Sequence, residues 1–255
     1  MKYLMLMLSL FLTGSIQGEK PLKLKVMTYN LRFGELASLE QLAEFIKSED
    51  PDLVALQELD WMTKRDRAPH QHDKDFITEL GYRTHMFSLY GKTIPYAGGY
   101  YGIGLLSKKP YVNMKKIILP KAEGVKEYRA LLMAEIEVSE ADTIVFASTH
   151  LDYSSSEARI AQVKVITSVL KDCGYPVIVG GDFNATPDSP EIKEYFKDWK
   201  SLSSDQLTSP AKRPKNKIDY LFAYPLHLWK LISSQVPPIQ FSDHLPIISE
   251  VELMK

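Results

Sequence analysis

Two kinds of apolar pattern run along this 255-residue chain. Apolar–polar alternation or a short apolar run, typical of strands, occurs at 22–30, 53–56, 102–107, 111–119, 129–138, 143–150, 176–181, 218–223 and 245–251. Apolar residues on one helical face occur at 38–50, 75–80, 154–173 and after Ser189. The patterns predict an α/β chain with more strands than helices.

Short signals mark where several of these helices begin or end. The Ser38–Gln41 and Ser154–Glu157 segments are capping boxes, in which a serine is followed three residues later by Gln or Glu. Gly81 is expected to cap the helix over 75–80 at its C-terminus. Pro190 is expected at the first position of the last helix.

The spacing of the central strands indicates how the sheets are built. Strands 102–107 and 111–119 are joined by a tight turn, as are strands 129–138 and 143–150, so each pair is expected to be antiparallel. This mixture of hairpins and helices excludes a barrel of parallel strands alone. Two mixed, mainly antiparallel sheets packed face to face, with helices outside, would bury every apolar face. One domain over residues 19–255 suffices.

The start of the chain differs from the rest. Lys2 is the only charge before an apolar run that ends at Leu12, and small or polar residues follow to Gly18. This order is typical of a secretory signal peptide over residues 1–18, and the run is short for a membrane-spanning helix. An uncleaved anchor is the alternative. We therefore expect a secreted or periplasmic protein that has no permanent membrane span after cleavage.

Composition narrows the class of protein without identifying it. Hydrophobic residues make up 45% and charged residues 25%, the balance of a soluble globular protein, for which we expect a monomer. The formal net charge of −1 provides no broad positive field, so nucleic acid is a conceivable but not a favoured partner. Cys173 is the only cysteine, which excludes an intramolecular disulfide and favours an inert thiol.

Polar residues gather at or just beyond the ends of predicted strands. At such places a rigid scaffold can bring distant side chains to one cleft. Any one of these residues could instead be a turn or capping residue, but together they predict a site of catalysis. They are Asn30, Glu58, His150, Asp182, Asn184, Asp219, Asp243 and His244.

Three of these residues suit a hard cation. Asn30 and Glu58 offer oxygen ligands, and Asp243 is expected to face the same metal. A few protein oxygens with several retained waters describe Mg²⁺ or Mn²⁺ better than zinc, and the histidines form no zinc-binding spacing. A bound cation would polarise a phosphoryl oxygen and offset the charge on a leaving oxygen.

Asp182 and Asn184 lie two positions apart in a Gly-Gly-Asp-Phe-Asn motif. In a locally extended chain both would point to the same side and could share one substrate, while Phe183 would turn into the core. A plain glycine-rich turn is the alternative. His244 is the candidate general base or water-orienting group, with Asp219 as the carboxylate that fixes its tautomer.

Four residues are candidates for contact with the substrate, of which Arg129, Lys217 and Tyr101 are additional to the strand-end set. His150 and Arg129 would donate to non-bridging phosphate oxygens, although Arg129 could instead pin a carboxylate. Lys217 belongs to a basic loop that leads to the candidate catalytic aspartate, and such a loop is usually solvated surface. Tyr101 belongs to a tyrosine-rich segment that could form an aromatic lip over the cleft or a mobile loop.

Seven short motifs, each weak alone, together resemble the endonuclease/exonuclease/phosphatase superfamily. They occur in the family's order and cover nearly all of the chain after residue 18. They are TYNL at 28–31, PDLVALQE at 51–58, GIGLLS at 102–107, THLD at 149–152, GDFN at 181–184, IDY at 218–220 and SDH at 242–244.

The resemblance implies a four-layer α/β/β/α sandwich with its site at one rim. It implies metal binding by Asn30 and Glu58, with Asp243 as a further ligand. It also implies roles in placing water and contacting phosphate for five residues, namely Asp182, Asn184, His150 and the His244–Asp219 pair.

The expected function is divalent-metal-dependent hydrolysis of a phosphate ester outside the cytoplasm, with a phosphodiester favoured. Near-neutral charge and export favour a small phosphodiester or a phospholipid head group as substrate. An endonuclease or exonuclease acting on DNA or RNA is the first alternative, and a catalytically silent binding module of the same fold is the second. Fold and metal site indicate which bond is broken, but not which molecule carries it.

Overall fold

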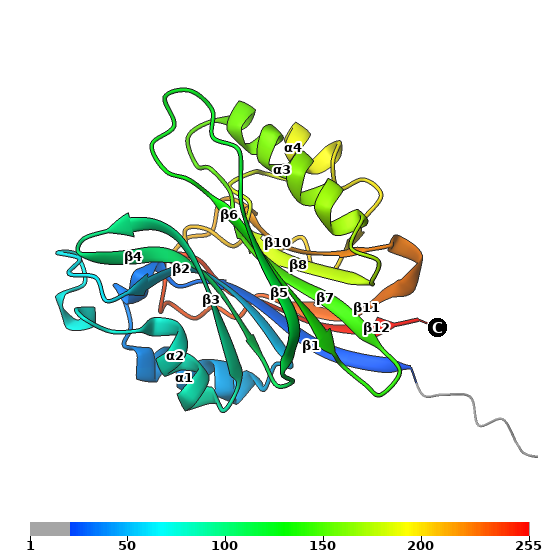
Figure 1. Ribbon diagram of the computed structural model, residues 1–255, viewed down its shortest axis with the longest axis horizontal. Helices are drawn as coiled ribbons and strands as arrows, with labels where there is room; N and C mark the ends of the chain where they lie inside the picture. Colours follow the sequence, from blue (N-terminus) through cyan, green and yellow to red (C-terminus); the bar gives the residue numbers. More distant parts are fainter. Residues whose placement is uncertain (1–20, 255) are drawn as a thin grey trace, which may run out of the picture.

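The computed structural model describes residues 21–254. Twelve strands form two sheets of six, and Figure 1 shows the sheets packed face to face with helices on both outer sides. The strands are β1 (Leu22–Asn30), β2 (Leu53–Trp61), β3 (Phe87–Tyr96), β4 (Gly99–Ser107), β5 (Tyr111–Ile118), β6 (Ala130–Glu137), β7 (Thr143–His150), β8 (Val177–Asp182), β9 (Lys200–Ser201), β10 (Asp219–Tyr224), β11 (Trp229–Gln235) and β12 (Ile247–Leu253).

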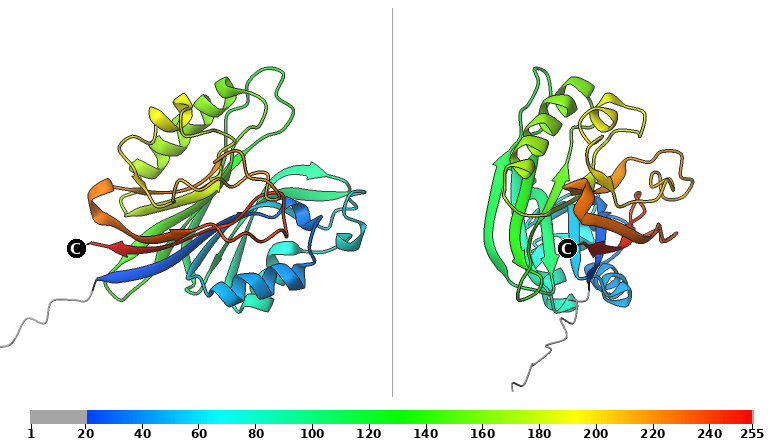
Figure 2. Two further views of the ribbon diagram at one scale, coloured as in Figure 1. Left: turned by 180° about the vertical axis from the view of Figure 1, so that it is seen from behind. Right: turned by 90° about the vertical axis from the view of Figure 1, so that its right-hand side faces the viewer.

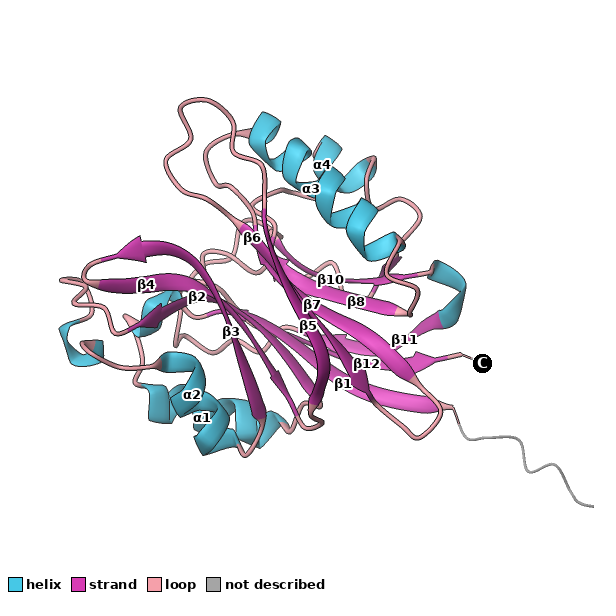
Figure 3. Cartoon of the chain, viewed as in Figure 1, coloured by secondary structure: helices cyan, strands magenta, loops and turns pink. Residues whose placement is uncertain are grey.

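The helices lie in two outer layers, so that the expected four-layer α/β/β/α sandwich is confirmed (Figure 2). One pair packs on the sheet that contains β1, and the other packs on the sheet that contains β8 (Figure 3). The four α-helices are α1 (Leu39–Glu49), α2 (Phe76–Thr84), α3 (Ser156–Lys171) and α4 (Pro190–Lys193). Three 3-10 turns are η1 (Arg32–Gly34), η2 (Pro69–Gln71) and η3 (Leu226–Leu228).

Each sheet has one parallel strand pair at its centre and antiparallel pairs around it. The first sheet has the order β11-β12-β1-β2-β4-β3, and β1 is parallel to β2. The second has the order β5-β6-β7-β8-β10-β9, and β7 is parallel to β8. The mixed, mainly antiparallel arrangement expected from the sequence is therefore confirmed, as is the antiparallel pairing of β6 with β7. The expected pairing of strands 102–107 and 111–119 is wrong, because β4 pairs with β2 and β3 whereas β5 pairs with β6 in the other sheet, so the short turn between them connects the two sheets.

Apolar side chains fill three interfaces between the four layers. Val26 and Phe146 belong to the cluster between the two sheets. Ile46 belongs to the cluster under α1 and α2, and Phe183 to the cluster under α3 and α4, so Phe183 does turn into the core. A buried polar bridge crosses between the sheets, where Gln57 donates to the Ser148 hydroxyl at 3.2 Å.

Two helix boundaries differ from the expectations. Helix α2 passes through Gly81 and ends at Thr84, where His85 adopts the left-handed cap conformation with φ of 59°. Gly81 is needed instead for packing, because a Cβ there would lie 2.7 Å from the Cβ of Ser88. The cap of α3 is Ser155, which accepts from Ala158 at 3.2 Å, because Asp152 holds the hydroxyl of Ser154.

The apolar pattern of the sequence did not predict the two edge strands of the first sheet. β3 and β11 are half exposed edge strands, so they lack the apolar alternation that marks a buried face. No helix within residues 21–254 is long and apolar enough to span a membrane. The expected signal peptide over residues 1–18 lies outside the described residues.

Candidate active site

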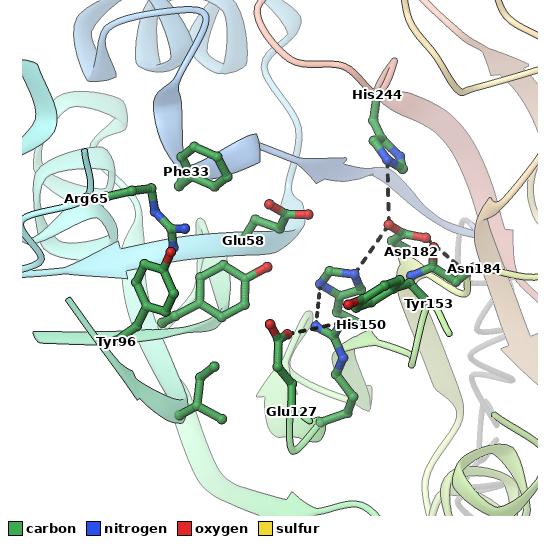
Figure 4. Close-up of a pocket in the computed structure, with 13 residues that line it drawn as sticks. Phe33, Glu58, Arg65, Tyr96, Glu127, His150, Tyr153, Asp182, Asn184 and His244 are labelled. Carbon is green, nitrogen blue, oxygen red and sulfur yellow. Dashed lines mark hydrogen bonds and ion pairs between the residues drawn. The ribbon is translucent and has the colours of Figure 1, made fainter. Parts of the chain in front are cut away.

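A cavity of about 260 Å³ opens at one rim of the sandwich and is lined by residues of both sheets. Figure 4 shows two different ends of this cavity. At one end His244, Asp182 and Asn184 lie together, and at the other end Arg65 lies beside Tyr96. Most of the polar residues that the sequence singled out line this cavity or contact residues that do.

The parallel strand pairs explain why residues distant in sequence meet here. Asn30 lies opposite Gln57 where β1 and β2 end, and His150 lies opposite Asp182 where β7 and β8 end. β10 runs beside β8 and begins at Asp219, opposite Asp182. Because parallel strands end at the same edge, one edge of each sheet carries polar residues into the gap between the sheets.

Glu58 reaches the cavity from an irregularity in β2. The register between β2 and β4 shifts between Leu56 and Leu59, and Glu58 has a left-handed φ of 58°. A bulge of this kind redirects a side chain that would otherwise follow the pleat of the strand. Burial raises the pKa of the Glu58 carboxyl above its ordinary value, although the Asn30 amide opposes that rise.

Asn30 connects the two halves of the site through its amide nitrogen. That nitrogen donates to Glu58 Oε1 at 3.0 Å and to Asp182 Oδ2 at 3.1 Å. Its amide oxygen accepts from the backbone N–H of Arg32 at 2.9 Å, which fixes the orientation of the amide. In this arrangement the Asn30 amide contacts two carboxylates and one backbone N–H, and its expected role as a metal ligand stays a prediction.

His244 lies between two buried aspartates. Its Nδ1 lies 2.9 Å from Asp219 Oδ2, and its Nε2 lies 3.7 Å from Asp182 Oδ2. Burial alone would lower the pKa of His244, but the two carboxylates outweigh it and raise the pKa to about 10. The two carboxylates therefore favour the protonated, cationic form of His244, and its role as a general base or water-orienting group stays a prediction.

The pKa of Asp182 suits a base at neutral pH better than that of His244 does. Burial raises its pKa to about 7, against the lowering effect of His244 and with a further rise from Asp219. Its Oδ2 is contacted by Asn30 and faces both imidazoles, while its Oδ1 accepts from the backbone N–H of Asn184 at 2.9 Å. Asp182 is thus the centre of the polar cluster.

His150 is neutral and held in one tautomer. Arg129 Nη1 lies 3.3 Å from His150 Nδ1 and can only donate, so the ring proton resides on Nε2. Nε2 lies 3.5 Å from Asp182 Oδ2. Burial, with Arg129 and His244 nearby, lowers the pKa of His150 well below its ordinary value.

Arg129 contacts a carboxylate, one of the two roles considered for it, and its contact with phosphate stays a prediction. It lines the cavity, and its Nη2 also pairs with Glu127 at 3.3 Å. Its side chain is buried, and its Nε has no hydrogen-bond partner among residues 21–254. A buried guanidinium with an unpaired N–H next to a cavity is suited to an anionic ligand.

Asn184 lines the cavity, but not through an extended chain. It has a left-handed φ of 47°, and its Nδ2 donates to the carbonyl of Leu151 at 3.1 Å. The motif therefore turns sharply after β8, and this turn, in place of strand alternation, puts Asp182 and Asn184 on the same side.

Two expected site residues make other contacts. Lys217 does not line the cavity, because its buried ammonium donates to the Ser204 carbonyl at 2.6 Å and pairs with Asp205 at 3.4 Å. Asp243 forms an ion pair with Arg32 and does not line the cavity either. The structure therefore does not bring Lys217 or Asp243 to the cavity wall. Tyr101, by contrast, is buried and lines the cavity from β4.

The sequence did not single out every residue of the cavity wall as a site candidate. Phe33, Arg65, Tyr96, Glu127 and Tyr153 all line it. Only the tyrosine-rich segment around Tyr96 drew attention, since Arg65 and Phe33 lie in loops without a recognisable motif. The left-handed φ of 45° at Phe33 shows that its loop is a specific conformation, and one-dimensional patterns do not report such a feature.

The donor groups present fit a hard divalent cation. Glu58 is a carboxylate at the cavity that makes no ion pair with a described residue, and its raised pKa reflects the cost of leaving its charge uncompensated. Oxygens of Asp182 and Asp219 and a ring nitrogen of His244 also lie within 4.8 Å of one another. Because His244 is already held by Asp219, we consider Glu58, with Asp182, the better place for the ion.

This fold, with buried carboxylates and imidazoles at one rim, defines a class of metal-dependent phosphoester hydrolases. The sequence model of the Endonuclease/Exonuclease/phosphatase family matches residues 27–244, and the chain belongs to this family. A comparison with curated protein sequences finds no match.

Solved structures of the same fold come from diverse organisms. An endonuclease/exonuclease/phosphatase from Beutenbergia cavernae is 20% identical with a TM-score of 0.75, over 91% of this chain and 72% of that chain. A mannosyl-6-phosphatase from Bacteroides thetaiotaomicron is 16% identical with a TM-score of 0.72, over 91% and 100%. The human nocturnin catalytic domain, solved with a bound sulfate anion, is 21% identical with a TM-score of 0.69, over 91% and 94%. At these identities the likeness concerns the fold.

Proposed function

We propose that this protein is an exported Mg²⁺- or Mn²⁺-dependent phosphodiesterase that hydrolyses a compact phosphodiester. The observation that carries the proposal is the buried Asp182–His244–Asp219 chain, which faces the unpaired carboxylate of Glu58 in one cavity. This arrangement combines a proton acceptor, a cationic donor and a place for a divalent ion.

The hydrolysis uses these groups as follows. Asp182 takes a proton from water as the water oxygen bonds to phosphorus and the bond to the leaving oxygen breaks. The His244 imidazolium, held by Asp219, and the guanidinium of Arg129 donate to the non-bridging oxygens, on which charge increases. The leaving alkoxide takes a proton from solvent. A divalent ion, when bound at Glu58, supplies further charge stabilisation.

Charge supports a diester over a monoester. Glu58, Glu127, Asp182 and Asp219 carry four carboxylates at the site, against the two cations of Arg129 and protonated His244. One divalent ion brings this set close to neutrality. A singly charged diester then meets less repulsion than a doubly charged monoester, and the small cavity favours a compact substrate. The likeness to a mannosyl-6-phosphatase makes a monoester the natural comparison in an assay.

The assay uses the chain from residue 19 onward. We expect turnover of bis-p-nitrophenyl phosphate that EDTA abolishes and Mg²⁺ or Mn²⁺ restores, and slower turnover of p-nitrophenyl phosphate. His244→Ala should lower kcat by about 100-fold or more, whereas the exposed His227→Ala is the matched control. Activity that survives EDTA or His244→Ala would overturn the mechanism, and faster monoester turnover would overturn the substrate class.

The same assay separates the remaining substrates. DNA, RNA and sphingomyelin are offered in parallel, and the dependence on salt is measured. A steep loss of activity with salt on a nucleic acid would favour a nuclease, because each phosphate contact releases counterions. Mg²⁺ binding without turnover on every ester would identify a silent binding module.

Export is tested separately from chemistry. The full-length chain is expressed in a Gram-negative host, and the N-terminus of the periplasmic or secreted product is sequenced. We expect a chain that begins near residue 19. A product that retains residues 1–18 in the membrane fraction would contradict this part of the proposal.

A further inference from the structure

The end of the cavity farthest from His244 holds an unusually well-fixed guanidinium (Figure 4). Arg65 lies between the rings of Phe33 and Tyr96, with its central carbon 3.9 Å and 4.0 Å from the two ring centroids. Its Nε and Nη2 donate to the two carboxylate oxygens of Asp60, each at 2.8 Å. Asp60 in turn accepts from the Thr63 hydroxyl at 2.7 Å. Phe33, Asp60 and Thr63 are buried, whereas Tyr96 is 40% exposed at the mouth of the cavity.

The bonds to Asp60 use one edge of the guanidinium and leave the other edge free. A guanidinium carries five N–H donors in one plane, and the two bonds to Asp60 use the Nε edge. The three remaining donors, two on Nη1 and one on Nη2, make no bond to Asp60. Because Arg65 lines the cavity, this second edge is available to a ligand.

The charge of Arg65 is already compensated. Asp60 is 1% exposed and forms a two-point ion pair with it, so the pair as a whole is neutral. Glu58 also lies at the cavity, between this end and Asp182. This end of the cavity therefore offers directed hydrogen bonds and aromatic surface without the net positive charge that would attract a second anion.

The position of Arg65 relative to the catalytic groups determines which part of the substrate it contacts. In-line displacement puts the attacking water and the leaving oxygen on opposite sides of phosphorus. Glu58 lies between Asp182 and Arg65 in Figure 4, so with water at Asp182 and phosphorus near Glu58 the leaving group would extend toward Arg65. Arg65 thus faces the alcohol that hydrolysis releases.

We propose a leaving-group subsite that binds an uncharged, hydroxylated ring, such as the sugar released from a sugar phosphodiester. It is formed by Phe33, Arg65, Tyr96 and Tyr101. Ring hydroxyls accept from the free guanidinium edge, and the ring carbons pack against the aromatic side chains. An apolar leaving group would leave the free guanidinium donors unpaired, and an anionic one would meet an Arg65 whose charge Asp60 already compensates. This inference rests on the proposed phosphodiesterase function.

The test compares two diesters that release alcohols of similar size. One is the methyl phosphodiester of the glucose 6-hydroxyl, assayed by release of glucose, and the other is methyl cyclohexylmethyl phosphate, assayed by release of its alcohol. We expect kcat/KM to favour the sugar diester by about 10-fold or more, mainly through KM. Equal turnover of the two, or a preference for the cyclohexyl compound, would overturn the subsite.

Variants identify the residues responsible. Arg65→Met should bring the ratio of the two kcat/KM values to about one, whereas the exposed Arg213→Met should leave the ratio at its wild-type value. Because Arg65→Met leaves Asp60 buried without its partner, the double variant Asp60→Asn/Arg65→Met and the variant Tyr96→Ala are made as well. A ratio that stays at the wild-type value in all three would refute the role of Arg65.

Failure of the subsite can be distinguished from failure of the proposed function. If bis-p-nitrophenyl phosphate is turned over with a divalent ion but the sugar preference is absent, only the subsite is wrong. If no diester is turned over under any metal condition, the phosphodiesterase proposal itself fails.

Discussion

Arg129 donates from Nη1 to Nδ1 of His150 across 3.3 Å, and this contact determines which ring nitrogen of His150 carries the proton. With Nδ1 acting as acceptor, Nε2–H is directed toward Asp182, 3.5 Å away. Both side chains are buried, so water cannot readily substitute for either partner. The pair therefore presents a fixed N–H donor at the catalytic end of the cavity.

Removing Arg129 should lower kcat for two reasons. A cationic donor is lost, and His150 is no longer held in one tautomer. We expect Arg129→Ala to reduce kcat by about 100-fold on a diester, the magnitude seen for removal of one transition-state donor. Nitrogen NMR should then show both neutral tautomers of His150. The exposed Arg213→Ala serves as the control. A variant that retains kcat and a single tautomer would contradict this role.

Activity should depend on the protonation of Asp182. Burial raises the pKa of this carboxyl to about 7, so acidification protonates it and removes the base. We expect kcat/KM to rise with pH to a plateau, with a midpoint at or below about 7 because a bound cation lowers the pKa. Asp182→Asn should lose the activity together with the pH-dependent rise, whereas the exposed Asp66→Asn should keep both. A kcat/KM that does not rise with pH, or a rise that Asp182→Asn retains, would count against Asp182 as the base.

Glu58 should govern binding of the divalent ion. Glu58→Gln removes the charge while preserving the shape of the side chain and its contact with Asn30. We expect calorimetry with Mn²⁺ to show affinity weakened by about 10-fold or more, since a neutral amide is a poorer ligand for a hard cation. Glu44→Gln, exposed on α1, provides the matched control. Unchanged Mn²⁺ affinity would place the ion elsewhere.

Phe183 should contribute to stability more than to chemistry. It is fully buried and packs edge-on against Phe196, Tyr220 and Phe222, with centroids 5.3 to 5.5 Å apart. Phe183→Ala should lower the free energy of unfolding by about 3–5 kcal/mol, as for other large-to-small core substitutions. Urea unfolding measures this change, with Tyr82→Ala on the exposed face of α2 as the control. A loss below 1 kcal/mol would mean that the cluster repacks easily.

The sequence predicted buried strands well because burial on both faces leaves a continuous apolar run. β7 and β8 are of this kind. It failed at β3 and β11, where the strands lie at a sheet edge and one face meets solvent. It also misplaced the end of α2, because the glycine at 81 is required for close packing against Ser88 and not for a cap.

Within the site, the sequence found residues that end strands and missed residues that loops supply. Asp219 and His244 were paired correctly, and the structure holds them 2.9 Å apart. The protonation of His244 could not be read from the sequence, because it depends on two carboxylates from different strands. The sequence predicted that Lys217 contacts the substrate, but its ammonium donates to the carbonyl of Ser204 instead.

By itself, the sequence determined the layered α/β fold, the family and the polar residues at strand ends, because apolar periodicity and short motifs are local properties of the chain. The tertiary structure alone decided which atoms face one another. The turned amide of Asn30, the bulge at Glu58 and the guanidinium of Arg65 between two rings all arise from contacts between segments far apart in the chain. Such contacts set charge, tautomer and cavity shape, and no local pattern encodes them.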